Sequence, residues 1–330
     1  MMLLVAALVI VLGALVFTNA VEALGQVLRL GDAALGSLVA AWGTAMPEAI
    51  VPLIALLIGA PQAEREGLGI GAILGAPLLL ATIGFGLLAV SARIWRAAGR
   101  RKETLRFHRG HARQDLSIFL ITYAAVFALS FVPLRGVHIV CGVLLVLAYV
   151  VYGRRALMAS EPGTHSQHRV RLFFNLGGPP RPVLVVLQLL AALALLIGGA
   201  RLFVQVLDGL VPVLRLSPFV LSVVLTPLAT ELPELLNSVV WLRDGRDELA
   251  IGNVTGAMVF QATVLPAFGL WFSSWQLTPS EAVAWAITSA SALLVLLAVM
   301  RSRTADDPWL SGFLFYALFL AVMGTGIVPL

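Results

Sequence analysis

Ten apolar segments, most of them about 20 residues long, run through this chain of 330 residues. A helix of that length and composition is long enough to cross the hydrocarbon core of a bilayer. The mean hydropathy of the chain is +0.97. Charged residues make up 12% of it, roughly half the share that is usual in soluble domains. The sequence therefore predicts an all-α polytopic membrane protein that packs against the lipid bilayer.

The first segment, MMLLVAALVIVLGALVF, has no basic residues before its apolar run and no clear cleavage site, so we interpret it as a membrane span and not as a signal peptide. The single cysteine, Cys141, excludes a disulfide within the chain. The ten predicted spans are residues 2–24, 33–60, 67–91, 115–133, 137–153, 182–210, 217–242, 248–272, 280–300 and 309–328.

Basic residues gather in the loops on one side of these spans. The loop after the third span contains RIWRAAGRRKETLRFHRGHAR, and the loop after the fifth is also rich in arginine. The other side has only Arg65, Arg135 and Arg215. The positive-inside rule then places both termini outside and the basic loops in the cytoplasm. This distribution explains the net charge of +5 without nucleic acid, which we exclude as a partner. No obligatory protein partner is evident, and the short loops favour a prokaryotic cell membrane.

The two halves of the chain resemble each other. VLRL occurs at 27–30 and again at 213–216, and at this offset of 186 the segments 13–48 and 199–234 share 12 of 36 residues. Each copy holds five spans, an odd number, so the second copy must enter the membrane from the opposite side. The prediction is ten transmembrane helices as two inverted five-helix repeats, residues 1–155 and 182–330, joined by a cytoplasmic linker, 156–181. Transporters built this way bind their substrates near the midplane, on broken helices.

Acidic residues lie inside the second and seventh spans, where a carboxylate is costly and therefore seldom without function. Thr44 and Glu48 match Thr230 and Glu234 in the other copy, and Glu231 adds a third acid. Residues four apart share one face of a helix, and a proline just before each paired glutamate frees backbone carbonyls. The result is an oxygen-rich, negatively charged site of the kind that hard cations such as Ca²⁺ prefer. Two nearby carboxylates also repel each other, so we expect the pair to take up a proton readily when it holds no cation.

The next span of each copy matches as well. GIGAILGAPL (69–78) corresponds to AIGNVTGAMV (250–259), and glycines at these spacings predict close packing against the broken spans. The second copy alone adds polar side chains here: Asn253, Thr255 and Gln261. We interpret Asn253 and Gln261 as ligands or as groups that support the ligands.

These segments resemble the alpha-repeats of the cation/calcium exchanger superfamily, which includes Na⁺/Ca²⁺ and Ca²⁺/H⁺ exchangers. The repeats of that family read roughly G-T-S-x-P-E and then G-N-x-x-G-S-N. Here they stand as GTAMPE (43–48) with GAILGAP (71–77), and as ATELPE (229–234) with GNVTGAM (252–258). The resemblance covers essentially the whole chain. It implies ten helices, alternating access, and sliding of the first and sixth spans against the other eight.

The resemblance also implies that Thr44, Glu48, Thr230 and Glu234 ligate the cation. The family serine is replaced by Ala45 in one copy and by Glu231 in the other. Further family ligands fall at apolar residues of the first copy: Ala72, Ala76 and Leu80. The first half therefore lacks side chains that help to build sodium sites, so the number and identity of the coupling ions do not follow.

The sequence predicts a secondary antiporter that exchanges Ca²⁺ for Na⁺ or H⁺ and needs no cofactor. Its metal-ligating candidates are Glu48, Glu234, Thr44, Thr230, Glu231, Asn253 and Gln261. The alternatives are an antiporter for Mn²⁺, Mg²⁺ or Na⁺/H⁺, and a non-transporting membrane cation sensor. A membrane enzyme is disfavoured, because the chain contains no G-x-G-D, no H-E-x-x-H and no aspartate-rich diphosphate motif.

Overall fold

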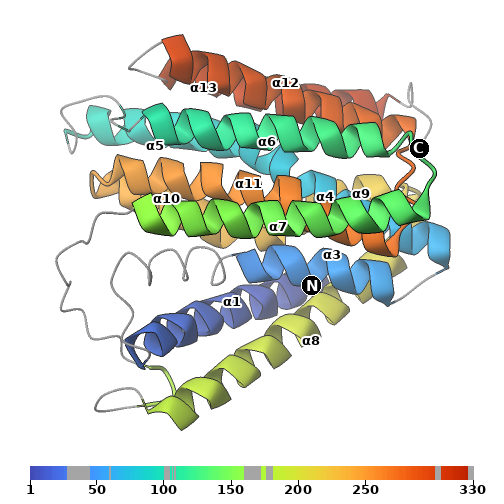
Figure 1. Cartoon of the computed structure of the whole chain (residues 1–330), viewed down its shortest axis with the longest axis horizontal. Coiled ribbons are helices and arrows are strands. Elements are labelled where there is room, and N and C mark those ends of the chain that lie inside the picture. Colours follow the sequence, from blue (N-terminus) through green and yellow to red (C-terminus); the bar gives the residue numbers. More distant parts are fainter. Residues whose placement is uncertain are drawn as a thin grey trace.

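The computed structural model describes most of the chain, and every regular element in the described part is a helix (Figure 1). The described residues are 1–27, 45–58, 61–99, 105, 107, 109–159, 172–175, 181–301 and 306–325. The helices of the first half are α1 (Met2–Val27), α3 (Ala45–Leu57), α4 (Gln62–Leu79), the π-helical turn η2 (Leu80–Gly84), α5 (Phe85–Ala97), α6 (Arg109–Leu129) and α7 (Arg135–Ala159). Those of the second half are α8 (Pro182–Leu214), α9 (Pro218–Thr230), α10 (Leu232–Arg243), α11 (Asp247–Phe272), α12 (Pro279–Arg301) and α13 (Asp306–Gly324).

The described helices fall where the sequence predicts membrane spans. Seven continuous helical stretches are long and apolar enough to cross a membrane, and α9 with α10 passes the same test as a bent pair. Two shorter apolar helices, residues Ala45–Leu57 and Pro308–Gly324, occupy the remaining predicted positions. The second predicted span is described only from Ala45 onward. The predicted all-α polytopic membrane fold is confirmed.

The seventh predicted span is broken in the middle. α9 and α10 meet at Glu231 with a bend of 46°. Pro227 lies inside α9, and Pro233 lies in the first turn of α10. Proline lacks the N–H group that a continuous helix needs and crowds the preceding turn, which explains why the helix breaks between them.

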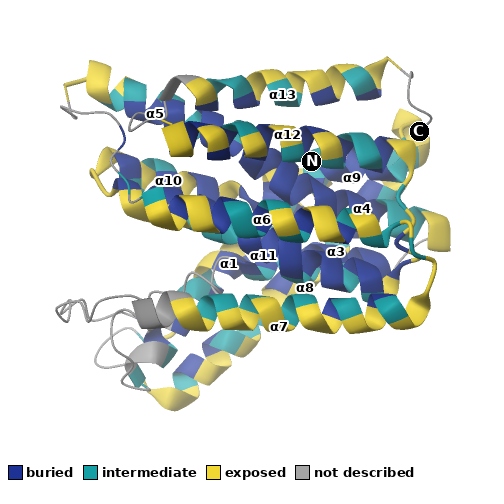
Figure 2. Cartoon of the chain, turned by 45° about the horizontal axis from the view of Figure 1, so that its top comes forward, coloured by how far each residue is buried: buried dark blue, intermediate teal, exposed yellow. Residues whose placement is uncertain are grey.

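The bundle has a buried centre and a lipid-facing exterior. The α4–α5 span is 83% buried and the α11 span 72% buried, whereas the α7 span is only 11% buried. Figure 2 shows this contrast, with α7 and α13 largely exposed around a dark interior. α1 and α8 pack against each other along one edge of the bundle (Figure 1). Since the exposed residues of these outer helices are mostly apolar, they are suited to contact lipid.

Contacts between helices repeat across the two halves. α3 packs on α11, and its counterpart α9 packs on α4. In the same way α7 packs on α11, and α13 packs on α5. Each half therefore supplies a central helix, α4 or α11, that is covered by the broken span of the other half.

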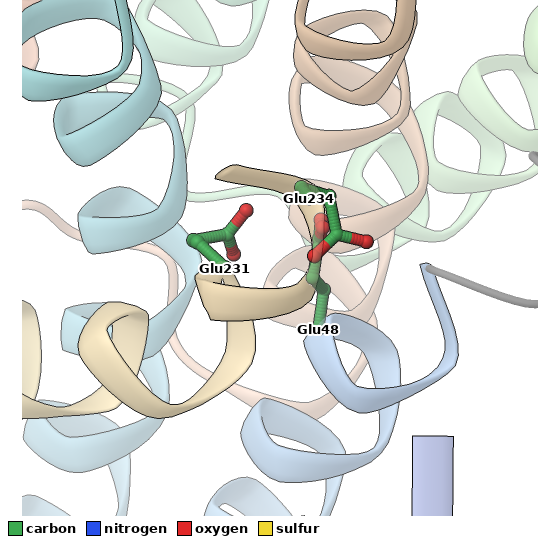
Figure 3. Close-up of side chains that lie close together, drawn as sticks. All are labelled: Glu48, Glu231 and Glu234. Carbon is green, nitrogen blue, oxygen red and sulfur yellow. The ribbon is translucent and has the colours of Figure 1, made fainter. Parts of the chain in front are cut away.

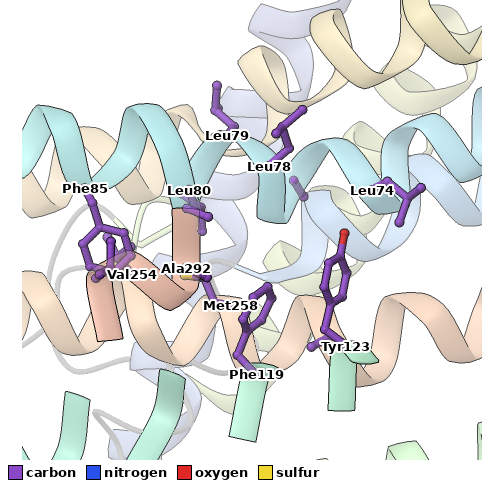
Figure 4. Packing of buried hydrophobic residues seen from close by; sticks show 14 of the residues in the cluster. Leu74, Leu78, Leu79, Leu80, Phe85, Phe119, Tyr123, Val254, Met258 and Ala292 are labelled. Carbon is purple, nitrogen blue, oxygen red and sulfur yellow. The ribbon is translucent and has the colours of Figure 1, made fainter. Parts of the chain in front are cut away.

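A large apolar core anchors these central helices. Leu74 and Leu78 of α4 lie near Phe119 and Tyr123 of α6, with Met258 of α11 close by (Figure 4). All five side chains are buried. Interiors of this kind are close-packed and resist deformation, so they provide a fixed frame for polar groups on α11.

The predicted glycine packing is confirmed for α4 and stays a prediction for α11. A Cβ atom at Gly75 would lie 2.6 Å from the carbonyl oxygen of Val223, and one at Gly71 would lie 2.7 Å from Cβ of Ser222. α4 and α9 therefore approach each other closely. Among the described residues, nothing lies within 4 Å of a Cβ built at Gly252. The first-half segment that corresponds to α9, residues 32–44, lies outside the described residues.

Candidate cation site

Three glutamates meet at the break between α9 and α10. Glu231 occupies the break itself, Glu234 lies in the first turn of α10, and Glu48 comes from α3 across the interface between the two halves (Figure 3). The amino end of a helix favours negative charge, so the start of α10 suits the carboxylate of Glu234. Glu231, at the break, lies in the same cluster.

The cluster is compact and buried. One carboxylate oxygen from each glutamate lies within 4.8 Å of the other two. Glu48 is 2% exposed, and Glu231 and Glu234 are fully buried. The charges of Glu48 and Glu234 both act on Glu231. Like charges held this close in a dry interior repel strongly, so the arrangement is suited to hold a cation that all three oxygens can face.

Gln261 of α11 links two of these glutamates. Its Nε2 donates one hydrogen bond to Oε2 of Glu48 at 2.8 Å and another to Oε2 of Glu231 at 2.9 Å. Gln261 is fully buried, and its Oε1 has no hydrogen-bond partner among the described residues, as is also true of Oε1 of Glu48. The amide thus presents its nitrogen to the acids and not its oxygen. It would ligate a cation only after turning over.

Thr230 lies beside the cluster, at the end of α9. The spacing predicts that it shares a helix face with Glu234. The break places the two residues in different helices, so the four-residue rule does not apply to them. The hydroxyl of Thr230 lies 3.1 Å from Oε1 of Glu231, to which it can donate, and 3.3 Å from the carbonyl oxygen of Thr226.

Asn253 supports the backbone of α10. Its Nδ2 donates to the carbonyl oxygen of Glu234 at 3.3 Å and to Oγ of Ser238 at 3.2 Å. Ser238 in turn donates to the carbonyl oxygen of Ala250 on α11. This network ties α10 to α11 and fixes the direction of Glu234. The position of Asn253 is that of a group that supports a ligand.

The remaining predicted features belong to the first half. Thr44 lies outside the described residues. On the first-half side, Ala45, Ala72, Ala76 and Leu80 are all buried and apolar, so these positions add no side-chain oxygen to the site.

The sequence reasoning missed Asp115. This aspartate of α6 is buried, and its Oδ2 accepts a hydrogen bond from the hydroxyl of Thr255 at 2.7 Å. Its Oδ1 accepts one from the hydroxyl of Tyr152 at 2.9 Å. Thr255 therefore takes part, through Asp115, in a hydrogen-bonded contact between α6, α7 and α11, and not in the glutamate cluster. The available signal was an acid at the start of an otherwise apolar predicted span, residues 115–133.

Comparison with known proteins agrees with this geometry. Residues 1–156 and 184–327 match the family described as sodium/calcium exchanger protein. The inner membrane protein YrbG of Escherichia coli is 25% identical over 275 residues, which cover 81% of this chain and 76% of that protein.

Two solved structures share the fold. The crystal structure of the H⁺/Ca²⁺ exchanger CAX superposes with a TM-score of 0.74 at 18% identity, over 98% of this chain and 84% of that one. The sodium-calcium exchanger NCX_Mj, soaked with Na⁺ and Sr²⁺, superposes with a TM-score of 0.61 at 19% identity, over 97% of both chains. With its inverted helix contacts and its cluster of acids at a broken span, the chain belongs to the sodium/calcium exchanger family of membrane transporters and is not an enzyme.

Proposed function

We propose that this protein is a secondary antiporter that moves Ca²⁺ against Na⁺ or H⁺ by alternating access. The observation that carries the proposal is the buried cluster of Glu48, Glu231 and Glu234, with one oxygen of each within 4.8 Å of the others. Ca²⁺ is a hard cation that takes six to eight oxygen ligands at about 2.3–2.6 Å, several of them carboxylate oxygens. A buried group of three carboxylates between two helical halves matches this demand.

The proposed ligands come from both repeats. Glu48 and Glu234 supply the central carboxylates, and Glu231 adds a third from the break. Thr230 lies within reach of Glu231, and Thr44 is proposed as its first-half counterpart. Because the competing ion would use the same carboxylates, the two ions cannot load together, and this competition couples their movements.

Membrane orientation forms part of the proposal. We propose a cell-membrane protein with both termini outside, the basic linker 156–181 in the cytoplasm, and residues 1–155 and 182–330 as its two repeats. In that arrangement the site is shared between the repeats, because Glu48 lies in one and Glu234 in the other. Movement of one repeat against the other would then open the site alternately to each side.

The test is Ca²⁺ uptake into proteoliposomes that contain the purified protein. Uptake is driven in separate experiments by an outward Na⁺ gradient and an outward H⁺ gradient. We expect uptake under one of the two gradients, which identifies the coupling ion. Glu48→Gln and Glu234→Gln should each abolish it, because the amide keeps the size of the side chain and removes its charge.

Thr263→Val provides a matched control. Thr263 is a buried residue of α11. Among the described residues, its hydroxyl bonds only to carbonyl oxygens of its own helix, those of Val259 and Phe260. This variant should transport normally. Folded, membrane-inserted native protein that takes up no Ca²⁺ under either gradient would refute the proposal.

A further inference from the structure

The two halves of the chain differ at a matched pair of positions near the cluster. When 43–48 is aligned with 229–234, Glu231 corresponds to Ala45. When the alignment of 71–77 with 252–258 is extended along the same span, Gln261 corresponds to Leu80. Both apolar residues are buried, Ala45 at 7% exposure and Leu80 at 0%. The second half has thus two polar residues where the first half has two apolar ones.

The two polar residues contact each other directly. Nε2 of Gln261 donates to Oε2 of Glu231 at 2.9 Å, although the residues lie 30 positions apart on different helices. The same nitrogen donates to Oε2 of Glu48 at 2.8 Å. One amide group therefore bridges the carboxylate that is unique to the second half and a carboxylate of the symmetric pair.

This contact has a physical reason. A third buried carboxylate adds repulsion to a site that already holds two. Hydrogen bonds to charged acceptors are stronger than those between neutral groups, and an amide nitrogen supplies two donors without adding charge. Gln261 therefore stabilises the additional charge of Glu231. In the other half, where Ala45 replaces that glutamate, the position of Gln261 is occupied by the apolar Leu80.

We infer that Gln261 is a positioning residue for Glu231 and that the two act as one unit, which adds a third, correctly oriented carboxylate to the cation site. The inference rests on the proposed function for its effect on transport. The contact between the two side chains and the matched apolar pair support it independently of which ions are moved. It predicts that substitutions at these two positions are not independent.

The test is a double-mutant cycle in which the second half is changed to resemble the first. The variants are Gln261→Leu, Glu231→Ala and the two combined, with Thr263→Val as the control on the same helix. Two quantities are measured for each full-length protein: the Ca²⁺ concentration that gives half-maximal uptake, and the midpoint of thermal unfolding in detergent without Ca²⁺.

We expect Gln261→Leu alone to raise the half-maximal Ca²⁺ concentration by about tenfold or more, because Glu231 and Glu48 both lose a strong hydrogen bond. It should also lower the unfolding midpoint. In the presence of Glu231→Ala, the same substitution should have a smaller effect on both quantities, because only the hydrogen bond to Glu48 remains to be lost. The two effects on the half-maximal Ca²⁺ concentration should differ by more than about twofold, which exceeds the additivity error of independent sites. Thr263→Val should match the native protein in affinity.

Additive effects in the cycle would overturn the inference, since they would make Gln261 an ordinary buried residue that is indifferent to Glu231. A better affinity in Gln261→Leu would also overturn it. If the native protein takes up no Ca²⁺, the proposed function fails instead. The unfolding midpoints then decide the pairing alone, with coupling supporting the inference and additivity refuting it.

Discussion

Gly75 allows a sharp test of how the α4–α9 interface supports the site. Its position on α4 is so close to α9 that an added Cβ would lie 2.6 Å from the carbonyl oxygen of Val223 and 2.7 Å from Cγ of Pro227. Contact distances below 3.0 Å are essentially never seen for real Cβ atoms. The carbonyl belongs to the backbone and cannot rotate away, so Gly75→Ala must push the two helices apart.

The size of the effect follows from two opposing contributions. Overpacking of an interior costs typically about 1–3 kcal/mol, whereas replacing glycine by alanine within a helix gains about 1 kcal/mol. Gly252→Ala is the matched control, because it lies in the corresponding repeat segment and nothing described lies within 4 Å of its added methyl group. Gly252→Ala should therefore gain up to about 1 kcal/mol. Gly75→Ala should be less stable than this control by about 1–3 kcal/mol.

The assay is thermal unfolding of the purified variants in one detergent, followed by Ca²⁺ uptake. At roughly 2–4 °C per kcal/mol for chains of 150–250 residues, and less for longer ones, the difference should amount to several degrees. Because α9 ends next to Glu231, displacement of this helix should also reduce uptake in Gly75→Ala and not in Gly252→Ala. A Gly75→Ala variant as stable and as active as Gly252→Ala would refute the argument that close approach of these helices positions the break.

Three further predictions concern other parts of the molecule. In a Ca²⁺ chelator, Glu234→Gln should unfold at a higher temperature than the native protein, because one repelling charge is removed. It should also lose the stabilisation that Ca²⁺ gives the native protein, about 2.7 kcal/mol at a Ca²⁺ concentration of 100 times the dissociation constant. Equal Ca²⁺-induced shifts of the unfolding temperature in the two proteins would contradict this. Thr255→Val should cost about 1–3 kcal/mol of unfolding free energy, because Oδ2 of Asp115 loses its donor in a buried setting, and an unchanged denaturation midpoint would show that Asp115 finds another partner. Gln188→Leu should lower the uptake rate and the unfolding midpoint, because the side chain of Gln188 bonds to Asn19 of α1 and to the backbone N–H of linker residue 174; native values in both measurements would show that this link between α1, α8 and the linker is dispensable.

Several features could be predicted because they depend on local chemistry. Apolar segments of about 20 residues require burial in lipid or protein, whatever their neighbours are. Pro227 and Pro233 weaken a helix in any surroundings, so the sequence predicted a break near them. The matched glutamates Glu48 and Glu234 pointed to one site, because an inverted repeat brings equivalent positions of its two halves together.

Other features depend on which helices become neighbours. Gly71 and Gly252 occupy corresponding positions of similar segments, and among the described residues only Gly71 has a neighbouring helix at close range. Thr230 and Glu234 were expected on one helix, but a 46° bend separates their helices, and the hydroxyl of Thr230 lies 3.1 Å from Oε1 of Glu231. A pattern of spacing assumes a continuous helix, and it fails at the point where the chain departs from one.

The sequence by itself determined that this chain spans a membrane, that its two halves are related by inversion, and that a pair of acids lies at their broken helices. These conclusions follow from solvation cost and from repetition, and both can be read along the chain. The sequence also offered Glu231 as a third acid, but only the tertiary structure showed that its carboxylate lies within 4.8 Å of the pair and that Gln261 bridges Glu231 and Glu48. Only the structure likewise showed that Asn253 supports the backbone of α10. Hydrogen bonds act over about 3 Å, and distances of that size between separate helices are set by the bend of one helix and the packing of all the others.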